Sequence, residues 1–242
     1  MRDRVNQSVW QGVVAVMAVV IGLLMVGTTP VFAEGEDERV IERNSNMFGN
    51  TYAEWSAQWW QWVLSIPEAT NPNLDTTGAK CGMGQAGPVW FLAGTFVSGT
   101  FTRTCTVPAA KALFFPIVNA VFGSAVSDCN PTAPSVVCNL AALRQSASTS
   151  MDSVRLQASL DGEPLRLLSA QRVQSPEFTL TLPAQAVFGI PAGTYTPQVS
   201  DGYWLMLTPL RPGAHTIRFR GEITAGVFAG FVADVTYNLT VQ

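Results

Sequence analysis

The chain has 242 residues, a formal net charge of −3 and only 13% charged residues. Apolar residues make up 48% of it, which excludes a disordered chain, and the length allows one substantial hydrophobic core or two small ones. Lys80 and Lys111 are its only lysines, and no basic patch is available to neutralise phosphates, so we expect no nucleic acid partner.

The N-terminus is typical of a secretory signal peptide. Arg2 and Arg4 give a positive start, and an uncharged apolar run follows over residues 12–27. Val31-Phe32-Ala33 has the small or β-branched residues that signal peptidase accepts. The apolar run is short for a membrane span, which takes about 20 apolar residues. We therefore expect cleavage after Ala33, a secreted or periplasmic address and no stable span in the mature chain; an uncleaved anchor is the alternative.

Three parts are expected after the cleavage site. Residues 34–50 are polar and acidic, which predicts a disordered N-terminal segment. Residues 51–242 are expected to form a single domain. Thr51 and Glu54 have the spacing of a capping box, which predicts a helix over 52–65.

Tryptophan is concentrated in this predicted helix. Trp55, Trp59 and Trp62 recur at helical spacing, which favours packing of one face against a broad apolar surface. Trp60 lies beside that stripe. An exposed indole can stack on a sugar or anchor a protein partner, and the candidates for such a binding site are Trp60 and Trp204. The alternative, which we favour, is that both belong to the core.

The next segment, residues 67–87, has the Pro, Asn, Asp and Gly content of a long loop. Four side chains in it carry oxygens of the kind that ligate Ca²⁺: Glu68, Asn71, Asn73 and Asp75. Their spacing differs from that of an EF-hand. A solvated loop of local Asx turns is therefore the favoured reading, with calcium as the alternative and no other cofactor expected.

All four cysteines follow the predicted cleavage site: Cys81, Cys105, Cys129 and Cys138. An even number in an exported chain predicts two disulfides, with three possible pairings. We favour Cys81–Cys105, which would join the ends of a hairpin, and Cys129–Cys138, which would close a short loop. Zinc is disfavoured because paired thiolates at short spacing and histidine helpers are both missing.

From residue 88 onward, short runs of β-branched and aromatic residues alternate with Gly and Pro. Asn139 is placed to cap a second helix over 139–151, and Asp161-Gly162 is a turn between two later strands. Short β-prone runs separated by Gly and Pro predict a mainly β fold with minor α. We expect an antiparallel immunoglobulin-like sandwich with the N-terminal Trp-rich helix packed on it.

A set of four segments stands out in the first half of the chain after the cleavage site. They are residues 52–62 (YAEWSAQWWQW), 84–95 (GQAGPVWFLAGT), 110–119 (AKALFFPIVN) and the step Cys105-Thr106-Val107-Pro108. The set resembles a family of uncharacterised exported bacterial proteins. The resemblance covers roughly the first half of the chain after the cleavage site. It implies a secreted bacterial domain and brings no activity with it.

The sequence offers little catalytic chemistry. His215 is the only histidine, and because no nucleophile motif lies nearby, a structural role at the start of a strand is favoured. Carboxylate pairs hydrolyse glycosides without histidine. The candidates for such a pair are scattered along the chain: Glu54, Glu68, Asp75, Asp128, Asp201 and Asp234. Their spacing does not predict that any two of them face each other.

We therefore expect a non-enzymatic binding or structural module of the bacterial cell envelope or secretome, with a glycan or an envelope protein as partner. The first alternative is a secreted carboxylate-dependent hydrolase acting on polysaccharide, with or without Ca²⁺. The second is a subunit of a surface protein assembly. A binding module needs an exposed aromatic platform, a hydrolase needs two carboxylates in a cleft, and an assembly subunit needs an apolar patch.

Overall fold

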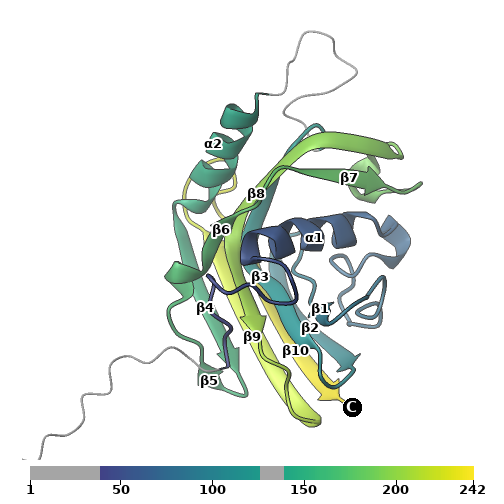
Figure 1. The fold of residues 1–242 in the computed structure, drawn as a ribbon, viewed down its shortest axis with the longest axis vertical. Helices are drawn as coiled ribbons and strands as arrows, with labels where there is room; N and C mark the ends of the chain where they lie inside the picture. Colours follow the sequence, from purple (N-terminus) through teal and green to yellow (C-terminus); the bar gives the residue numbers. More distant parts are fainter. Residues whose placement is uncertain (1–38, 126–138) are drawn as a thin grey trace, which may run out of the picture. The chain divides into compact units, whose positions relative to one another are not determined.

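The computed structural model describes residues 39–125 and 139–242, which form a mainly β structure (Figure 1). The predicted signal peptide, Asp128 and the Cys129–Cys138 pair lie outside these residues. The central sheet contains β1 (Val89–Phe91), β3 (Ala112–Gly123), β8 (Gly193–Leu207), β6 (Arg172–Gln174) and β7 (Phe178–Leu182). The outer sheet contains β2 (Gly99–Val107), β10 (Val232–Val241), β9 (Gly213–Ile223), β4 (Val154–Leu160) and β5 (Glu163–Pro164).

The helices are α1 (Tyr52–Leu64) and α2 (Leu140–Met151), and short 3-10 turns span Glu68–Thr70, Leu168–Gln171 and Val187–Gly189. Before α1, the Thr51 hydroxyl accepts a hydrogen bond from the backbone N–H of Glu54, whose carboxylate accepts one from the N–H of Thr51. Asn139 caps α2 in a similar way through its side-chain oxygen. No described helix is long and apolar enough to cross a membrane.

Both sheets are mixed. β1 runs parallel to β3 and β2 runs parallel to β10, whereas the other strand pairs are antiparallel. The mainly β prediction is confirmed, and the prediction of purely antiparallel pairing is wrong for these two pairs. The reason is the chain path: after β1 the chain crosses to β2 in the outer sheet before it returns as β3, and such a crossover makes β1 and β3 parallel.

The central sheet lies between α1 and the outer sheet (Figure 1). On β3, Phe114 packs in the cluster beneath α1, whereas Leu113 and Phe115 pack toward the outer sheet. On β8, Trp204 packs in the cluster beneath α1, whereas Leu205 packs toward the outer sheet. Because both of its faces are covered, a strand of this sheet needs apolar side chains at nearly every position, in place of the alternation of a half-exposed strand.

The segment before α1 belongs to the fold. The N–H of Ile41 donates to the carbonyl of Met206 on β8 at 2.8 Å, and the hydroxyl of Tyr52 bridges the same two residues. Ile41 is 9% exposed and packs in the cluster under α1. The prediction of disorder over 34–50 is therefore wrong for residues 39–50, because one apolar side chain and a backbone hydrogen bond fasten them to β8.

Arg103 on β2 joins three parts of the chain from a buried position, with 1% of its surface exposed. Its Nε donates to the carbonyl of Asp75 at 2.7 Å. Its Nη1 donates to the carbonyls of Ala93 and Gly94 after β1, at 2.9 and 2.8 Å, and to the hydroxyl of Tyr237 on β10 at 2.9 Å. Protein acceptors thus replace the water that this charge loses on burial.

The loop over 67–87 also docks on the edge of β2. The N–H of Thr104 donates to the carbonyl of Thr77 at 2.8 Å, and the disulfide Cys81–Cys105 is present as predicted. Gly78 lies against this edge with φ +91°, and a Cβ there would lie 2.3 Å from the carbonyl oxygen of Thr104. The loop therefore covers part of an edge strand that would otherwise expose unpaired backbone groups.

Arg103→Met tests the role of the buried guanidinium. The substitution keeps an apolar stem of similar length but leaves several buried acceptors unpaired, each costing about 1–3 kcal/mol. We expect the free energy of unfolding, measured by urea denaturation with the disulfide intact, to fall by about 3 kcal/mol or more. Arg155→Met is the control, because that side chain on β4 is 71% exposed and should change stability by less than about 0.5 kcal/mol. Equal effects of the two variants would contradict this role.

Candidate binding face on the outer sheet

The outward face of the outer sheet is polar because its strands alternate. On β9, Ile217 and Phe219 are buried, so Arg218 and Arg220 lie on the opposite face. On β2 the exposed alternate positions are all threonine: Thr100, Thr102, Thr104 and Thr106. The strand register sets them beside Asp234, Thr236, Asn238 and Thr240 of β10.

A cavity of about 350 Å³ opens at the β4 side of this face. Its polar lining consists of Gln157, Ser159, Arg218 and Arg220, and its apolar lining of Leu156, Ala158, Pro164, Leu165 and Leu168. The volume lies within the range of small-molecule sites, and the mixture of an apolar lining with a few polar groups is typical of them. We call this cavity the β4–β9 cavity.

Ion pairs hold the two arginines of the β4–β9 cavity. Arg218 donates from Nε and Nη2 to both carboxylate oxygens of Asp234, at 3.0 and 2.8 Å, and this pairing raises the pKa of Arg218. Arg220 donates to Glu222 at 2.8 Å, and Arg155 donates to the same carboxylate at 3.1 Å. The hydrogen bond from Arg220 is the main reason why the pKa of Glu222 is lowered. Both arginines therefore keep a fixed position and retain further N–H donors.

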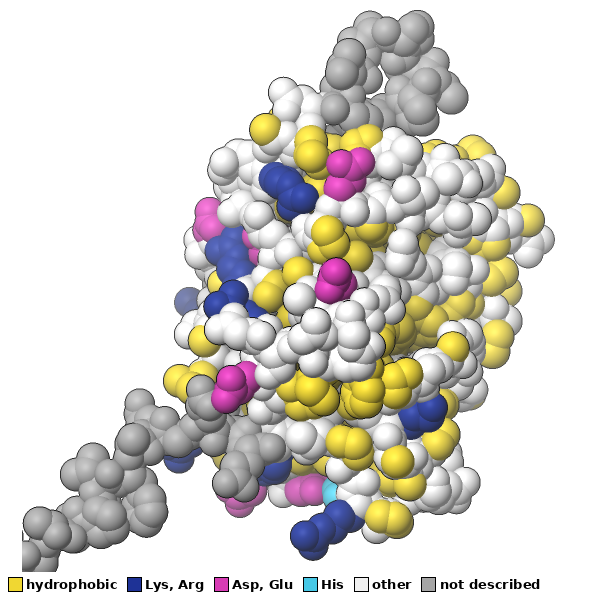
Figure 2. Space-filling view, in the orientation of Figure 1, with side chains coloured by type: hydrophobic (Ala, Val, Ile, Leu, Met, Phe, Trp, Pro, Cys, Tyr) yellow, Lys and Arg dark blue, Asp and Glu magenta, His cyan; other side chains and the backbone are white. Residues whose placement is uncertain are grey.

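Hydroxyl and amide groups in the cavity and on the same face of β10 and β2 are open to a ligand. The side chains that make no hydrogen bond to any described residue are Thr100, Thr102, Thr104, Thr106, Gln157, Ser159, Thr236, Asn238 and Thr240. On the face of the molecule drawn in Figure 2, charged side chains stand singly or in small groups among hydrophobic and uncharged side chains. This face could not be predicted from the sequence, because alternation shows which residues are exposed but not which strands become neighbours.

The candidate binding role of Trp60 and Trp204 requires exposed indoles, and the structure buries both. Trp60 is 5% exposed and Trp204 is fully buried. The ring of Trp204 stacks on Phe114 with centroids 5.2 Å apart and meets Trp59 edge to face at 5.4 Å. α1 covers the face of β8 on which Trp204 lies, so a surface platform for sugars does not exist at either position. The alternative of two core residues is the one that the structure supports.

The four candidate calcium ligands do not form a solvated loop. Asn71, Asn73 and Asp75 are buried, whereas Glu68 is exposed. The side chain of Asn71 donates to the carbonyl of Val63 at 2.7 Å and accepts from the N–H of Asn73 at 2.9 Å. These oxygens stabilise the loop itself, and no group of three or more His, Cys, Asp or Glu side chains gathers as a metal site within the described part of the chain.

Most of the candidate catalytic carboxylates have structural partners. Burial alone would raise the pKa of Asp75, but hydrogen bonds from Lys80 and Thr77 outweigh it and lower that pKa. Hydrogen bonds from Thr51 lower the pKa of Glu54. A general acid of a glycosidase needs the opposite shift, a raised pKa that keeps it protonated.

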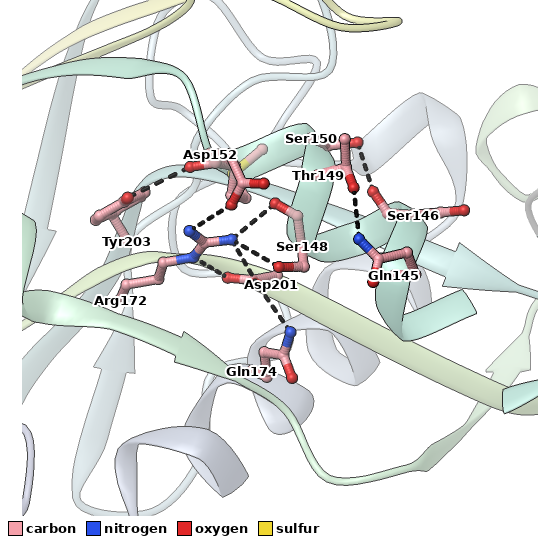
Figure 3. Close-up of polar contacts among 11 residues, drawn as sticks. Gln145, Ser146, Ser148, Thr149, Ser150, Asp152, Arg172, Gln174, Asp201 and Tyr203 are labelled. Carbon is pink, nitrogen blue, oxygen red and sulfur yellow. Dashed lines mark hydrogen bonds and ion pairs between the residues drawn. The ribbon is translucent and has the colours of Figure 1, made fainter. Parts of the chain in front are cut away.

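Asp201 belongs to a polar cluster around Arg172 (Figure 3). Arg172 donates from Nε and Nη2 to the two carboxylate oxygens of Asp201, at 3.0 and 3.1 Å, and from Nη1 to Asp152 at 2.9 Å. Its Nη2 also donates to the carbonyl of Ser148 at 2.7 Å, and Gln174 donates to Asp201 at 3.1 Å. The cluster ties the end of α2 to β6 and β8, which gives Arg172 a structural role.

His215 is held by two acceptors. Its Nδ1 lies 2.8 Å from the carboxylate of Asp161, and its Nε2 lies 2.9 Å from the carbonyl of Arg211. The hydrogen bond to Asp161 is the main cause of a raised pKa at His215. Because both ring nitrogens are engaged, the ring has no free nitrogen with which to activate a nucleophile.

Comparison of the chain with known proteins returned no match to a family model, to a curated protein or to a solved structure.

Trp204→Ala tests whether this indole is part of the core. Removing a fully buried large side chain should lower the free energy of unfolding by about 3–5 kcal/mol in urea denaturation. Val227→Ala is the control, because Val227 is 83% exposed and its truncation should cost less than about 0.5 kcal/mol. A Trp204→Ala protein as stable as the control would show that the indole is not buried.

The His215–Asp161 pair should make stability depend on pH in a defined window. Partial burial disfavours the charge of Asp161, but hydrogen bonds from His215 and the Thr216 N–H outweigh it and lower the pKa of Asp161. The raised pKa of His215 gives a contribution that is complete below about pH 6.5 and is lost as pH rises through the folded-state pKa. The Asp161 contribution is complete above about pH 4 and is lost on acidification.

We expect Asp161→Asn to destabilise the protein by roughly 0.5 kcal/mol more at pH 5.5 than at pH 9, because the pair is partly exposed and screened. Urea unfolding at the two pH values measures this difference. In the His215→Gln background the same substitution should show no such difference, and a pH-independent effect in the wild-type background would contradict the assignment.

Proposed function

We propose that this protein is an exported binding module that recognises neutral glycans through the β4–β9 cavity and the adjoining polar face of the outer sheet. The observation that carries the proposal is the arrangement of Arg218 with Asp234 and of Arg220 with Glu222. Each pair sets hydrogen-bond donors beside acceptors at fixed positions. A sugar hydroxyl both donates and accepts, so such pairs fit its chemistry.

The other lining residues support the same class of ligand. Gln157 and Ser159 add uncommitted amide and hydroxyl groups, while Pro164 and Leu168 add the apolar surface on which the C–H face of a sugar ring packs. The unpaired threonines extend the recognition surface toward β2. A polymer with several sugar units would then gain further contacts along the sheet.

The charge balance favours a neutral ligand over an acidic polymer. Arg155, Arg218 and Arg220 face the carboxylates of Asp234 and Glu222, so two of the three positive charges are compensated locally. An acidic polysaccharide would compete with these carboxylates for the arginines and would bind in a salt-dependent manner. A neutral glycan would use the pairs as they stand.

An extracytoplasmic address for this module is supported by the N-terminal signal pattern and by the Cys81–Cys105 disulfide, because disulfides persist in oxidising compartments. A hydrolytic role is less well supported, since Glu54, Asp75 and Glu222 have lowered pKa values where a general acid needs a raised one.

A second candidate function, a subunit of a surface assembly, is favoured by a separate observation. Three uncharged connections carry exposed apolar side chains: Val97 after β1, Phe188 between β7 and β8, and Val227 with Phe228 between β9 and β10. Phe188 meets Phe96 with ring centroids 5.0 Å apart. Light scattering of the purified mature protein would reveal such self-association.

The glycan proposal is tested with a matched pair of variants. Arg220→Gln and Arg155→Gln each remove one arginine from Glu222 and leave the other in place, but only Arg220 lines the cavity. In titration calorimetry with cello-, xylo- and chito-oligosaccharides, we expect at least one to bind. Arg220→Gln should weaken it about tenfold, which is one lost charge-assisted hydrogen bond, while Arg155→Gln leaves it unchanged.

Three outcomes would contradict the proposal. Binding of none of these sugars, or equal losses in the two variants, would remove the cavity as the recognition site. Binding of an acidic polymer that weakens steeply with salt would replace the neutral ligand with an anionic one. Release of reducing ends from the oligosaccharides would favour the hydrolase instead.

A further inference from the structure

A second cavity lies on the other side of the connection between β5 and β6. It has a volume of about 160 Å³, equal to roughly five liquid waters. One wall comes from the segment before α1 and contains Val40, Glu42, Arg43 and Asn44; the other comes from the β5–β6 connection and contains Arg166, Leu167, Ala170 and Gln171. We call it the N-terminal cavity, and it shares no residue with the β4–β9 cavity.

The charges of the N-terminal cavity are of both signs. Arg166 makes no hydrogen bond or ion pair with any described residue. Arg43 donates from Nη1 to the carbonyl of Arg172 at 3.2 Å and keeps its other N–H groups for a ligand. Two guanidinium groups on facing segments suit a carboxylate, which accepts hydrogen bonds in a bidentate manner. Glu42 brings a negative charge to the same cavity.

Gln171 adds a buried acceptor. It is 9% exposed, and its Oε1 has no hydrogen-bond partner among the described residues. A buried amide oxygen without a donor is unfavourable, so a ligand with N–H groups would compensate it. A carboxylate has no hydrogen-bond donor, whereas an ammonium group has three N–H donors and can also form an ion pair with Glu42.

From this combination we infer that the N-terminal cavity binds a free α-amino acid with a small apolar side chain. The carboxylate is held by Arg43 and Arg166, and the ammonium group by Glu42 and Gln171. The side chain packs on the apolar lining, which Leu167 provides together with Val40 and Ala170. The volume suits a ligand of about the size of alanine to valine. This site is independent of the proposed glycan recognition, because the two cavities have separate lining residues.

The test uses L-valine with two analogues that each lack one charge, N-acetylvaline and valinamide. Backbone amide shifts of the ¹⁵N-labelled mature protein report binding at millimolar concentrations. We expect valine to shift the amides of residues 40–44 and 166–171 in a saturable way. Each analogue should bind about tenfold or more weakly, because one charge-assisted hydrogen bond is worth at least that factor.

Two variants and a control complete the experiment. Arg166→Gln and Glu42→Gln should each weaken valine about tenfold. Arg211→Gln should leave valine binding unchanged, because Arg211 is an exposed arginine that does not line the cavity. An undisturbed amide spectrum of each variant shows that it is folded.

The inference is overturned if valine causes no saturable shifts around the cavity, or if N-acetylvaline or valinamide binds as tightly as valine. It is also overturned if Arg166→Gln and Arg211→Gln have the same effect on binding. Failure of the oligosaccharide titration leaves this result unaffected, since that titration reports on Arg220 and the β4–β9 cavity.

Discussion

The buried guanidinium of Arg103 is the interaction on which the arrangement of the layers depends. It donates to the carbonyls of Ala93 and Gly94, which directly follow β1 of the central sheet. It also donates to the hydroxyl of Tyr237 on the outer sheet and to the carbonyl of Asp75 in the long loop. A cation can remain buried only where acceptors surround it, so these three parts of the chain must meet at one place. The Cys81–Cys105 disulfide holds the same loop to the same strand.

The contacts of Arg103 hold the two sheets face to face, and α1 covers the opposite face of the central sheet. The aromatic side chains of α1 are then needed to cover that face, and Trp59 and Trp204 pack against each other there. Aromatic residues that look like recognition residues in the sequence therefore contribute to stability. The proposed recognition surface is instead the polar face of the outer sheet, where Arg218 and Arg220 are oriented by carboxylates on their own sheet.

The connection between β5 and β6 separates the two candidate ligand sites. Leu165 and Leu168 line the β4–β9 cavity, whereas Arg166 and Leu167 line the N-terminal cavity. This connection carries the chain from the outer sheet to the central sheet, and Arg172 at its end is tied to Asp201 on β8. These hydrogen bonds fasten the end of the connection to β8.

The features that the sequence predicted correctly from neighbouring residues are the caps at Thr51 and Asn139 and the mainly β composition; for the cysteines it favoured Cys81–Cys105 among three possible pairings. Hydrogen bonds in a cap and alternation in a strand are local, so their patterns can be read from a few consecutive residues. Packing between distant segments settles the burial of Trp60 and Trp204, joins residues 39–50 to β8, and brings Arg43 and Arg166 to one cavity. Those outcomes depend on which distant segments pack together, and periodicity carries no information about that choice.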